Sequence, residues 1–276
     1  MQLKFTKMHG AGNDFVVIDL ISQRFDLHSR HVRKLADRRL GVGCDQVLVV
    51  EAPRTPNVDF RYRIYNADGE EVEQCGNGAR CFARFVRDKR LTRKRIITVE
   101  TAAGVLQLRV RDKHQVEVDM GAPILEPANI PHVAAVREPC YPLEVNGKSL
   151  EIGAVSMGNP HAILRVEQLD SAIVEELGPI IESHADFPQR CNAGFMRIIS
   201  ENEIALRVYE RGVGETLACG TGACAAVVYG MCRGWLRETV TVTLPGGKLT
   251  ISWAGEGEPV LMTGPTAVVF EGSIFI

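Results

Sequence analysis

The sequence predicts a mixed α/β protein made of two similar halves. One observation is that the order of strand and helix patterns in the first half recurs in the second. Another is a block of cysteine and glycine that precedes a helix pattern twice, as "CGNGA" from Cys75 and as "CGTGA" from Cys219. A recurring order of elements with matching motifs indicates an internal duplication.

The first half opens with strand patterns near residues 3–8 and 15–19 and a helix starting at Ser29, a residue type that favours helix N-caps. The segments "DQVLVVE" and "DFRYRIYN" follow, and the second alternates apolar and charged residues as a half-buried strand does. After Cys75, apolar residues at helical spacing predict a second helix. Further strands are predicted at residues 96–101, 105–110 and 116–120.

The second half follows a connector, residues 122–142, which contains five prolines and little periodicity. The pair Asn146-Gly147 predicts a hairpin, because it favours a type I′ turn. The same order then returns: strands near 154–157 and 162–166, a helix after Asp170, a hairpin of residues 195–199 and 204–209, a helix after Cys219, and a hairpin turning at "PGG".

The spacing of polar residues supports the duplication. Asn13 is followed by Gln46 after 33 residues, and Asn159 is followed by Asn192 after the same interval. The two asparagines are 159 − 13 = 146 residues apart, and the two cysteines are 219 − 75 = 144 apart. We therefore expect two half-sites, related by an approximate two-fold axis, to face each other across a cleft.

The composition is typical of a soluble globular protein. The chain has 276 residues, of which 45% are hydrophobic and 24% charged, and a net charge of −2. This charge gives no reason to expect nucleic acid or a membrane surface as a partner. The start "MQLKFTK" lacks the apolar core of a signal peptide, and no apolar run approaches the ~18 residues of a membrane span. A cytoplasmic location is expected.

The eight cysteines do not form a metal-binding pattern, because no C-x₂-C pair is present and no H-x₃₋₅-H element follows. A disulfide framework is not expected in a reducing compartment. Cys81, Cys224 and Cys232 fall within helix patterns and are expected in the core. Gly-x-Gly recurs, but the third glycine of a dinucleotide fingerprint is missing each time, which argues against nucleotide binding.

The paired blocks suggest a specific chemistry. The first amides of a helix lack intrahelical acceptors, and glycines allow a ligand to approach them, so each block predicts an anion site. A helix N-terminus also favours thiolate over thiol by roughly 0.3–1 kcal/mol. An amino-acid carboxylate held between two such helices would have one cysteine on each face of its α-carbon. One thiolate could remove the α-proton and the opposite thiol could return one, which inverts the centre.

Several blocks resemble those of the diaminopimelate epimerase family: "KMHGAGNDFVVID", "GVGCDQ", "YNADGEEVEQCGNGARC", "VSMGNPH", "CNAGF" and "VYERGVGETLACGTGA". The resemblance spans the whole chain. It implies interconversion of LL- and meso-2,6-diaminopimelate in bacterial lysine and peptidoglycan precursor synthesis, without cofactor or metal. It also implies a homodimer and two domains, each a mixed sheet curled around a central helix, over residues 1–120 with 265–276 and over residues 121–264, with the active site in the cleft between them.

The resemblance also implies roles for individual residues. Cys75 and Cys219 would be the acid and base, and His161 and Glu210 would adjust the thiols. The reacting carboxylate would be held by the amides of Gly76, Asn77, Gly220 and Thr221. Asn13, Gln46 and Glu210 would lie near the reacting end of the substrate, and the distal end would be bound by Asn66, Asn159, Asn192 and Arg211.

Two departures and two alternatives accompany this reading. Cys44 and Cys191 stand beside the amide positions, and Phe270 occupies a place where the family often has Tyr, in a tail linked to dimerisation. A proline or hydroxyproline racemase would use similar paired thiols, but Arg211 would then have no distal group to bind. A binding protein whose thiols only sense redox state is an alternative of another class.

Overall fold

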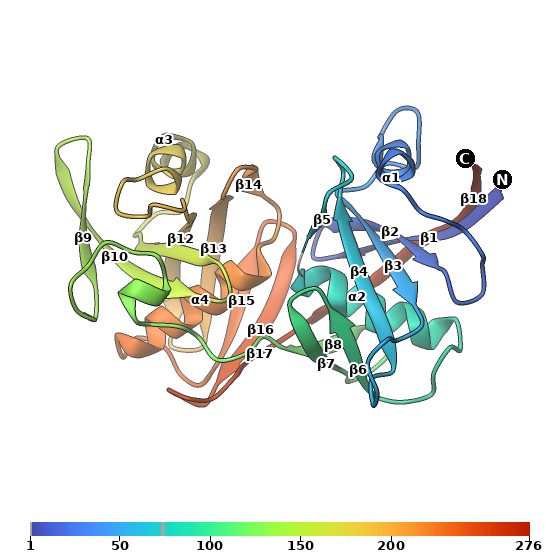
Figure 1. The fold of residues 1–276 in the computed structure, drawn as a ribbon. Coiled ribbons are helices and arrows are strands. Elements are labelled where there is room, and N and C mark those ends of the chain that lie inside the picture. The colour runs from blue at the N-terminus through green and yellow to red at the C-terminus, as the bar shows by residue number, and fades with distance from the viewer. Residues whose placement is uncertain (1, 73–74) are drawn as a thin grey trace. The chain divides into compact units, whose positions relative to one another are not determined.

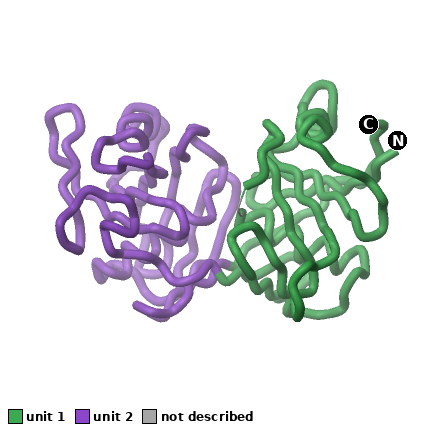
Figure 2. Tube along the Cα trace, in the orientation of Figure 1, with its two compact units in different colours: residues 1–119, 263–276 green, residues 120–262 purple. Residues whose placement is uncertain are grey.

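The computed structural model describes residues 2–72 and 75–276, and the chain divides into two compact units (Figure 2). Unit 1 takes in residues 1–119 and 263–276, and unit 2 takes in residues 120–262. β17 (Val260–Pro265) carries the chain from unit 2 back into unit 1. Each unit is a mixed β-sheet curled around one helix (Figure 1), so the predicted fold class is confirmed.

In unit 1 the sheet surrounds α2 (Gly76–Asp88), which contacts β1, β2, β3, β4, β7 and β8 (Figure 1). Every residue from 77 to 86 is therefore buried. β1 is antiparallel to β2 and β18, β2 is parallel to β3, and β3 is antiparallel to β4. The strands are β1 (Gln2–Gly10), β2 (Asn13–Asp19), β3 (Gln46–Glu51), β4 (Phe60–Asn66), β5 (Glu71–Val72), β6 (Ile96–Thr101), β7 (Gly104–Val110), β8 (Gln115–Asp119) and β18 (Ala267–Phe275).

The outer face of this sheet is covered by α1 (Ser29–Ala36). Val32 and Leu35 pack there with Val16 and Val47, so β2 and β3 are buried on both faces and consist of continuous apolar runs. The predicted N-cap at Ser29 was wrong by one residue. His28 is the cap, because its extended backbone precedes the first turn and its amide donates to Nδ1 of His31 at 3.2 Å.

Unit 2 repeats this plan around α4 (Gly220–Cys232), with α3 (Ser171–Glu182) on the outer face. β11 is parallel to β12, and β12 is antiparallel to β13, as in the matching strands of unit 1. The strands are β9 (Tyr141–Val145), β10 (Lys148–Ser156), β11 (Pro160–Arg165), β12 (Asn192–Ser200), β13 (Glu203–Glu210), β14 (Gly214–Thr216), β15 (Thr239–Leu244) and β16 (Gly247–Trp253).

The β9–β10 hairpin turns at Asn146 and Gly147, whose φ angles of 52° and 74° are those of the predicted type I′ turn. One expectation near it was wrong. The second arm of the hairpin and the strand near residues 154–157 are a single strand, β10, which passes through Gly153. A Cβ at Gly153 would lie 2.1 Å from the ring of Tyr229, so glycine lets the strand continue beneath α4. The connector contains one short 3₁₀ turn, η1 (Pro127–Asn129).

The bounds of the elements show how closely the halves correspond. β1 and β10 cover residues 2–10 and 148–156, an offset of 146, and α2 and α4 cover residues 76–88 and 220–232, an offset of 144. These are the offsets of the asparagines and of the cysteines in the sequence. Among the described residues, no helix has the length and apolar character needed to cross a bilayer.

Candidate active site

Each central helix begins directly after one of the two repeated cysteines. Cys75 is the N-cap of α2 and Cys219 is the N-cap of α4, and both have extended backbones, with φ of −145° and −108°. In unit 1 the hydroxyl of Tyr62 donates to the carbonyl oxygen of Cys75 at 3.4 Å. A Cβ at Gly78 would lie 2.5 Å from that hydroxyl, so the glycine lets α2 start close to β4. The first-turn amides of both helices point toward the cysteine end.

The predicted amides of unit 1 lie together at one edge of the sheet. Asn13 begins β2, Gln46 begins β3 and Asn66 ends β4. Because β2 is parallel to β3 and β3 is antiparallel to β4, these positions meet at the same end, with Gln46 opposite Asn66. Gln46 Nε2 donates to Asn66 Oδ1 at 2.9 Å. The Sγ of Cys75 lies 3.5 Å from Asn13 Oδ1, which joins this edge to the mouth of α2.

Unit 2 builds the same edge with different side chains. Asn159 precedes β11, Asn192 begins β12 and Glu210 ends β13. Asn192 is buried, its Nδ2 donates to the carbonyl of Pro160 at 3.2 Å, and its Oδ1 accepts the backbone amide of Arg211 at 3.0 Å. Asn192 therefore links β11 to the residue that follows β13.

His161 lies on β11 within this edge and is completely buried. Its Nε2 is 3.1 Å from Asn159 Oδ1, which can only accept, so Nε2 carries the hydrogen and Nδ1 is the bare nitrogen. Burial, together with the positive charge of Arg211, lowers the pKa of His161 to about 3. The imidazole is therefore neutral at pH 7. The guanidinium of Arg211 is exposed and donates from Nη1 to the carbonyl of Gln189 at 3.1 Å.

The Cys219 thiol has an environment that holds its proton. Cys219 is only 4% exposed, and its Sγ lies 3.6 Å from the hydroxyl of Thr221. Burial, and then the negative charge of Glu210, raise the pKa of Cys219 well above its usual value. The Glu210 carboxylate also accepts a hydrogen bond from the hydroxyl of Thr216. Cys219 is a thiol at neutral pH in this structure.

The structure thus brings together the predicted residues within each unit. We call the unit 1 set the first half-site and the unit 2 set the second half-site. The first half-site contains Asn13, Gln46, Asn66, Cys75, Gly76 and Asn77, and the second contains Asn159, His161, Asn192, Glu210, Arg211, Cys219, Gly220 and Thr221.

Two charged residues that contact the first half-site were not predicted from the sequence. Arg80 is completely buried, and its Nη2 donates to Asn77 Oδ1 at 2.8 Å. Asp45 accepts from Asn13 Nδ2 at 2.9 Å. Asp45 has a local signal, because it directly precedes Gln46, whereas Arg80 has none, because its burial depends on the closure of the sheet around α2.

The other cysteines differ from the helix-mouth pair. Cys81 and Cys224 are buried within the central helices, as predicted. Burial raises the pKa of Cys44 and of Cys191 to about 12, which fits packing residues. Cys232 was expected in the core, but it is exposed, because it is the last residue of α4 and the helix there leaves the enclosing strands.

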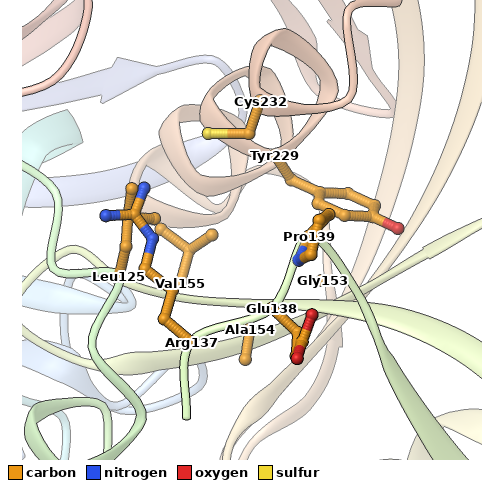
Figure 3. Close-up of a pocket in the computed structure, with 9 residues that line it drawn as sticks. All are labelled: Leu125, Arg137, Glu138, Pro139, Gly153, Ala154, Val155, Tyr229 and Cys232. Atoms are coloured by element: carbon orange, nitrogen blue, oxygen red, sulfur yellow. The ribbon is translucent and has the colours of Figure 1, made fainter.

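A cavity of about 280 Å³ lies in unit 2 and is lined by residues outside the two half-sites (Figure 3). Its walls come from the connector, from β10 and from the end of α4, which contributes Tyr229 and Cys232 (Figure 3). No residue of either half-site lines it. Within residues 2–72 and 75–276, no three His, Cys, Asp or Glu side chains gather as a metal site would require.

Solved structures with the same fold include a hydroxyproline epimerase from Agrobacterium vitis with bound trans-4-hydroxy-L-proline. It superimposes with a TM-score of 0.72 at 14% identity and covers 99% of this chain and 92% of its own. A predicted epimerase from Pseudomonas aeruginosa superimposes with a TM-score of 0.67 at 17% identity, covering 99% of each chain. The fold is therefore one found in a class of epimerases and racemases.

The sequence comparisons are more specific. A family model for diaminopimelate epimerase matches residues 5–126 and 153–269. The chain is 63% identical over 278 residues to the diaminopimelate epimerase of Thioalkalivibrio sulfidiphilus, covering 100% of both chains. It is 59% identical over 274 residues to that of Pseudomonas entomophila, covering 99% of both. The chain belongs to the diaminopimelate epimerase family and is an isomerase, which confirms the resemblance seen in the sequence.

Proposed function

We propose that this protein interconverts LL- and meso-2,6-diaminopimelate by a two-base mechanism, with Cys75 and Cys219 on opposite faces of the reacting α-carbon. The observation that carries the proposal is the duplication itself. Each unit places a cysteine at the N-terminus of a helix that is enclosed by the same arrangement of strands. The proposal requires the two half-sites to face each other across a cleft in the working enzyme.

In this mechanism the reacting carboxylate is bound by the first-turn amides of both helices, from Gly76, Asn77, Gly220 and Thr221. A thiolate takes the α-proton, so that the Cα–H bond breaks and an S–H bond forms. The opposite thiol then gives its proton to the other face of the carbanion. Positioned acid–base groups contribute about 10²–10⁴-fold, and the helix ends stabilise the charge that develops on the carboxylate.

The environment of Cys219 favours the role of proton donor in the resting enzyme. Its thiol pKa is raised by burial and by Glu210, so it enters the reaction protonated. Cys75 is more exposed and would be the base when the reaction starts from that state. After one turnover the protonation states are exchanged, and Glu210 and the neutral His161 are the groups we assign to their recovery.

The distal end of diaminopimelate is a second zwitterion and needs both charge and neutral hydrogen bonding. We assign its carboxylate to Arg211, which can bind it in a bidentate manner. Asn66, Asn159 and Asn192 would orient the distal end, while Asn13 and Gln46 would lie near the reacting end. These groups provide a reason for a cofactor-free and metal-free reaction, because the binding and proton-transfer functions all have protein groups assigned to them.

We further propose that the protein acts in the cytoplasm, in lysine and peptidoglycan precursor synthesis, with no nucleic acid or membrane partner. A homodimer is proposed through β18, where Val268, Val269, Phe270 and Phe275 are 40–73% exposed. β18 pairs with β1 on one side, and Phe270 packs edge-on against Phe5 with ring centroids 5.9 Å apart. An apolar strand surface of this kind is suited to a second copy of the chain.

The deciding experiment is proton NMR of the reduced protein with LL-diaminopimelate in D₂O, in the presence of a chelator. Appearance of the meso isomer with solvent deuterium at one α-carbon would support the proposal. A folded, reduced sample that yields neither exchange nor the meso isomer would contradict it. Turnover of proline or hydroxyproline in the same assay would identify the racemase alternative, and failure of every substrate would leave redox sensing as the reading to pursue.

A further inference from the structure

In unit 1 a series of hydrogen bonds runs from the guanidinium of Arg80 through two asparagine side chains to the carboxylate of Asp45. Arg80 Nη2 donates to Asn77 Oδ1 at 2.8 Å, and Asn77 Nδ2 points at Asn13 Oδ1 at 3.4 Å. Asn13 Nδ2 donates to Asp45 Oδ2 at 2.9 Å. The oxygen of Asn13 in the middle of this series is also the atom that faces the Sγ of Cys75, at 3.5 Å.

The groups at the two ends determine how both amides are turned. A guanidinium can only donate and a carboxylate can only accept. Asn77 must therefore turn its oxygen toward Arg80, which leaves its Nδ2 toward Asn13. Asn13 must turn its nitrogen toward Asp45, which leaves its oxygen toward Asn77 and Cys75. Reversing either amide would place a donor against a donor or an acceptor against an acceptor.

Both end groups are held in place. Arg80 is fully buried, and Gly10 leaves room for it, since a Cβ at that position would lie 3.3 Å from Nη2. Asp45 Oδ1 accepts from Arg38 at 2.8 Å, and its Oδ2 accepts from the backbone amide of Asp14 at 3.0 Å. Burying a guanidinium inside a domain is costly, which makes its presence there informative.

The second copy of the fold forms without this series. At the cysteine offset of 144, the counterpart of Arg80 is Cys224 and the counterpart of Asn77 is Thr221. At the asparagine offset of 146, the counterpart of Asp45 is Cys191. The curled sheet closes around α4 with these uncharged residues, so the charged ends are not a requirement of the fold.

We propose that Arg80 and Asp45 are positioning residues, which fix Asn13 so that it presents an oxygen to the sulfur of Cys75 and to the ammonium group of the bound amino acid. The part that concerns the ammonium group rests on the proposed function. The Asn13 oxygen accepts from the ammonium group of an α-amino acid, and the amide donors at the mouth of α2 bind its carboxylate. The two charged groups therefore bind at different positions. Fixing these two groups fixes the orientation of the α-carbon, and hence which of its bonds faces Cys75.

The test measures the pKa of the Cys75 thiol and needs no catalytic turnover. It therefore remains valid even if the proposed epimerase activity is not found. The rate of iodoacetamide alkylation at Cys75 is followed against pH, with the labelled peptide quantified by mass spectrometry. Asp45→Ala removes the acceptor that holds Asn13 Nδ2, and Arg80→Met removes the donor that holds Asn77. Each variant therefore loses one of the two constraints on the Asn13 amide, which can then turn its N–H toward the sulfur and stabilise the thiolate. The pKa of Cys75 should fall by about one unit in both variants.

In Arg80→Met the direction of the change distinguishes positioning from a simple charge effect. If Arg80 acted only through its positive charge, its removal would raise the pKa of Cys75, and that result would overturn the proposal. A matched control is Arg84→Met, which removes another buried guanidinium of α2, one that bonds to Asp88 and to the carbonyl of Lys113, and should leave the pKa of Cys75 unchanged. Arg80→Lys keeps a donor and should partly restore the wild-type pKa.

Asp45→Ala keeps the proposal testable if Arg80→Met fails to fold, because the side chain of Asp45 is 46% exposed. An unchanged pKa of Cys75 in a folded Asp45→Ala protein would refute the proposal. If epimerisation is established, both variants should also lose about tenfold in kcat/KM, chiefly through a higher KM, since they lose the orientation of the acceptor rather than a thiol.

Discussion

The mouths of α2 and α4 have the same backbone plan but different surroundings. At the mouth of α2, Cys75 is partly exposed and faces the amide oxygen of Asn13. At the mouth of α4, Cys219 is buried and lies near a hydroxyl and the carboxylate of Glu210. The duplication has therefore kept the position of the thiol while the groups that set its proton affinity have diverged.

This difference suits a reaction that needs one acid and one base at the same moment. Two identical sites would have equal proton affinity, and the singly protonated pair would have no preferred arrangement. In this protein the burial of Cys219 and the adjacent carboxylate favour its thiol form. We propose that this asymmetry selects which cysteine starts as the proton donor.

The largest effect is expected when one thiol is removed. Cys75→Ala and Cys219→Ala should each reduce epimerisation by about 10³-fold, because proton transfer on one face is lost. Each variant retains one base, so each should still exchange the α-hydrogen of one isomer with D₂O, and the preferred isomer should differ between them. NMR in D₂O measures both quantities, and Cys232→Ala should behave as wild type. Identical isomer preference in the two variants would contradict the two-sided arrangement.

A smaller loss is expected from Arg211→Ala, which tests whether the second half-site alone supplies a charge for the distal end. Hydrogen bonds to charged groups contribute about 1.5–3 kcal/mol, so binding of diaminopimelate should weaken about 10- to 100-fold. Binding of an amino acid with one carboxylate should hardly change. Competition assays compare the two ligands. Arg207→Ala removes a guanidinium from β13, the strand that precedes Arg211, where it pairs with Glu215, and serves as the matched control.

Glu210→Gln should reduce the difference in proton affinity between the Cys75 and Cys219 thiols. Burial is the larger cause of the raised pKa of Cys219 and the charge of Glu210 is the next, so the pKa should fall but remain above the usual thiol range. The pH dependence of alkylation at Cys219, read by mass spectrometry, reports it. Glu215→Gln is the control, because that carboxylate pairs with Arg207 instead. A rise in the pKa of Cys219 would show that the carboxylate does not act through its charge.

An effect on stability is expected from His161, whose counterpart in the first unit at the offset of 146 is Phe15. Its pKa falls from 6.5 to about 3 on folding, so the unfolded chain binds a proton that the folded chain does not. The stability it contributes is fully present above pH 6.5 and is lost as the pH falls. Between about pH 6 and pH 4 this adds about 1.4 kcal/mol per pH unit to the slope of the unfolding free energy.

Urea unfolding of the wild type and of His161→Gln at several pH values measures that slope. The variant should show a slope shallower by the equivalent of one proton, while His132, whose pKa is also lowered by burial, stays in both proteins. Equal slopes would mean that His161 is protonated in the folded protein.

Much of the fold could be predicted because the duplication is carried by local signals. The apolar runs of β2 and β3, the alternation of β4 and the turn at Asn146 each specify an element without long-range information. The repeated spacing of asparagine, glutamine and cysteine predicted the paired positions of the half-sites, whereas Asn66, His161, Glu210 and Arg211 were expected only from the resemblance to the family. The continuity of β10 through Gly153 could not, because it depends on the ring of Tyr229 from a distant helix.

Arg80 shows a second limit of sequence reasoning. An arginine in a helix is normally placed on the surface, and nothing in the local pattern states that α2 is enclosed on all sides. Only the closure of the sheet brings the guanidinium of Arg80 to the side chain of Asn77. The same closure brings Asp45 to Asn13, at the other end of this series of hydrogen bonds. Cys232 shows the opposite case. It was expected in the core because the apolar pattern of the helix continues to it, but the end of that helix is exposed.

The pairing of β1 with β18 has a consequence for the order of events during synthesis. β1 is made before unit 2 and pairs along its length with residues 267–275, from Gln2 opposite Phe275 to His9 opposite Ala267. Unit 2 lies in one uninterrupted stretch between these strands. On the ribosome, unit 2 can be completed while unit 1 still has one strand edge open to solvent. The half of the protein that is translated first is therefore the half that finishes folding last.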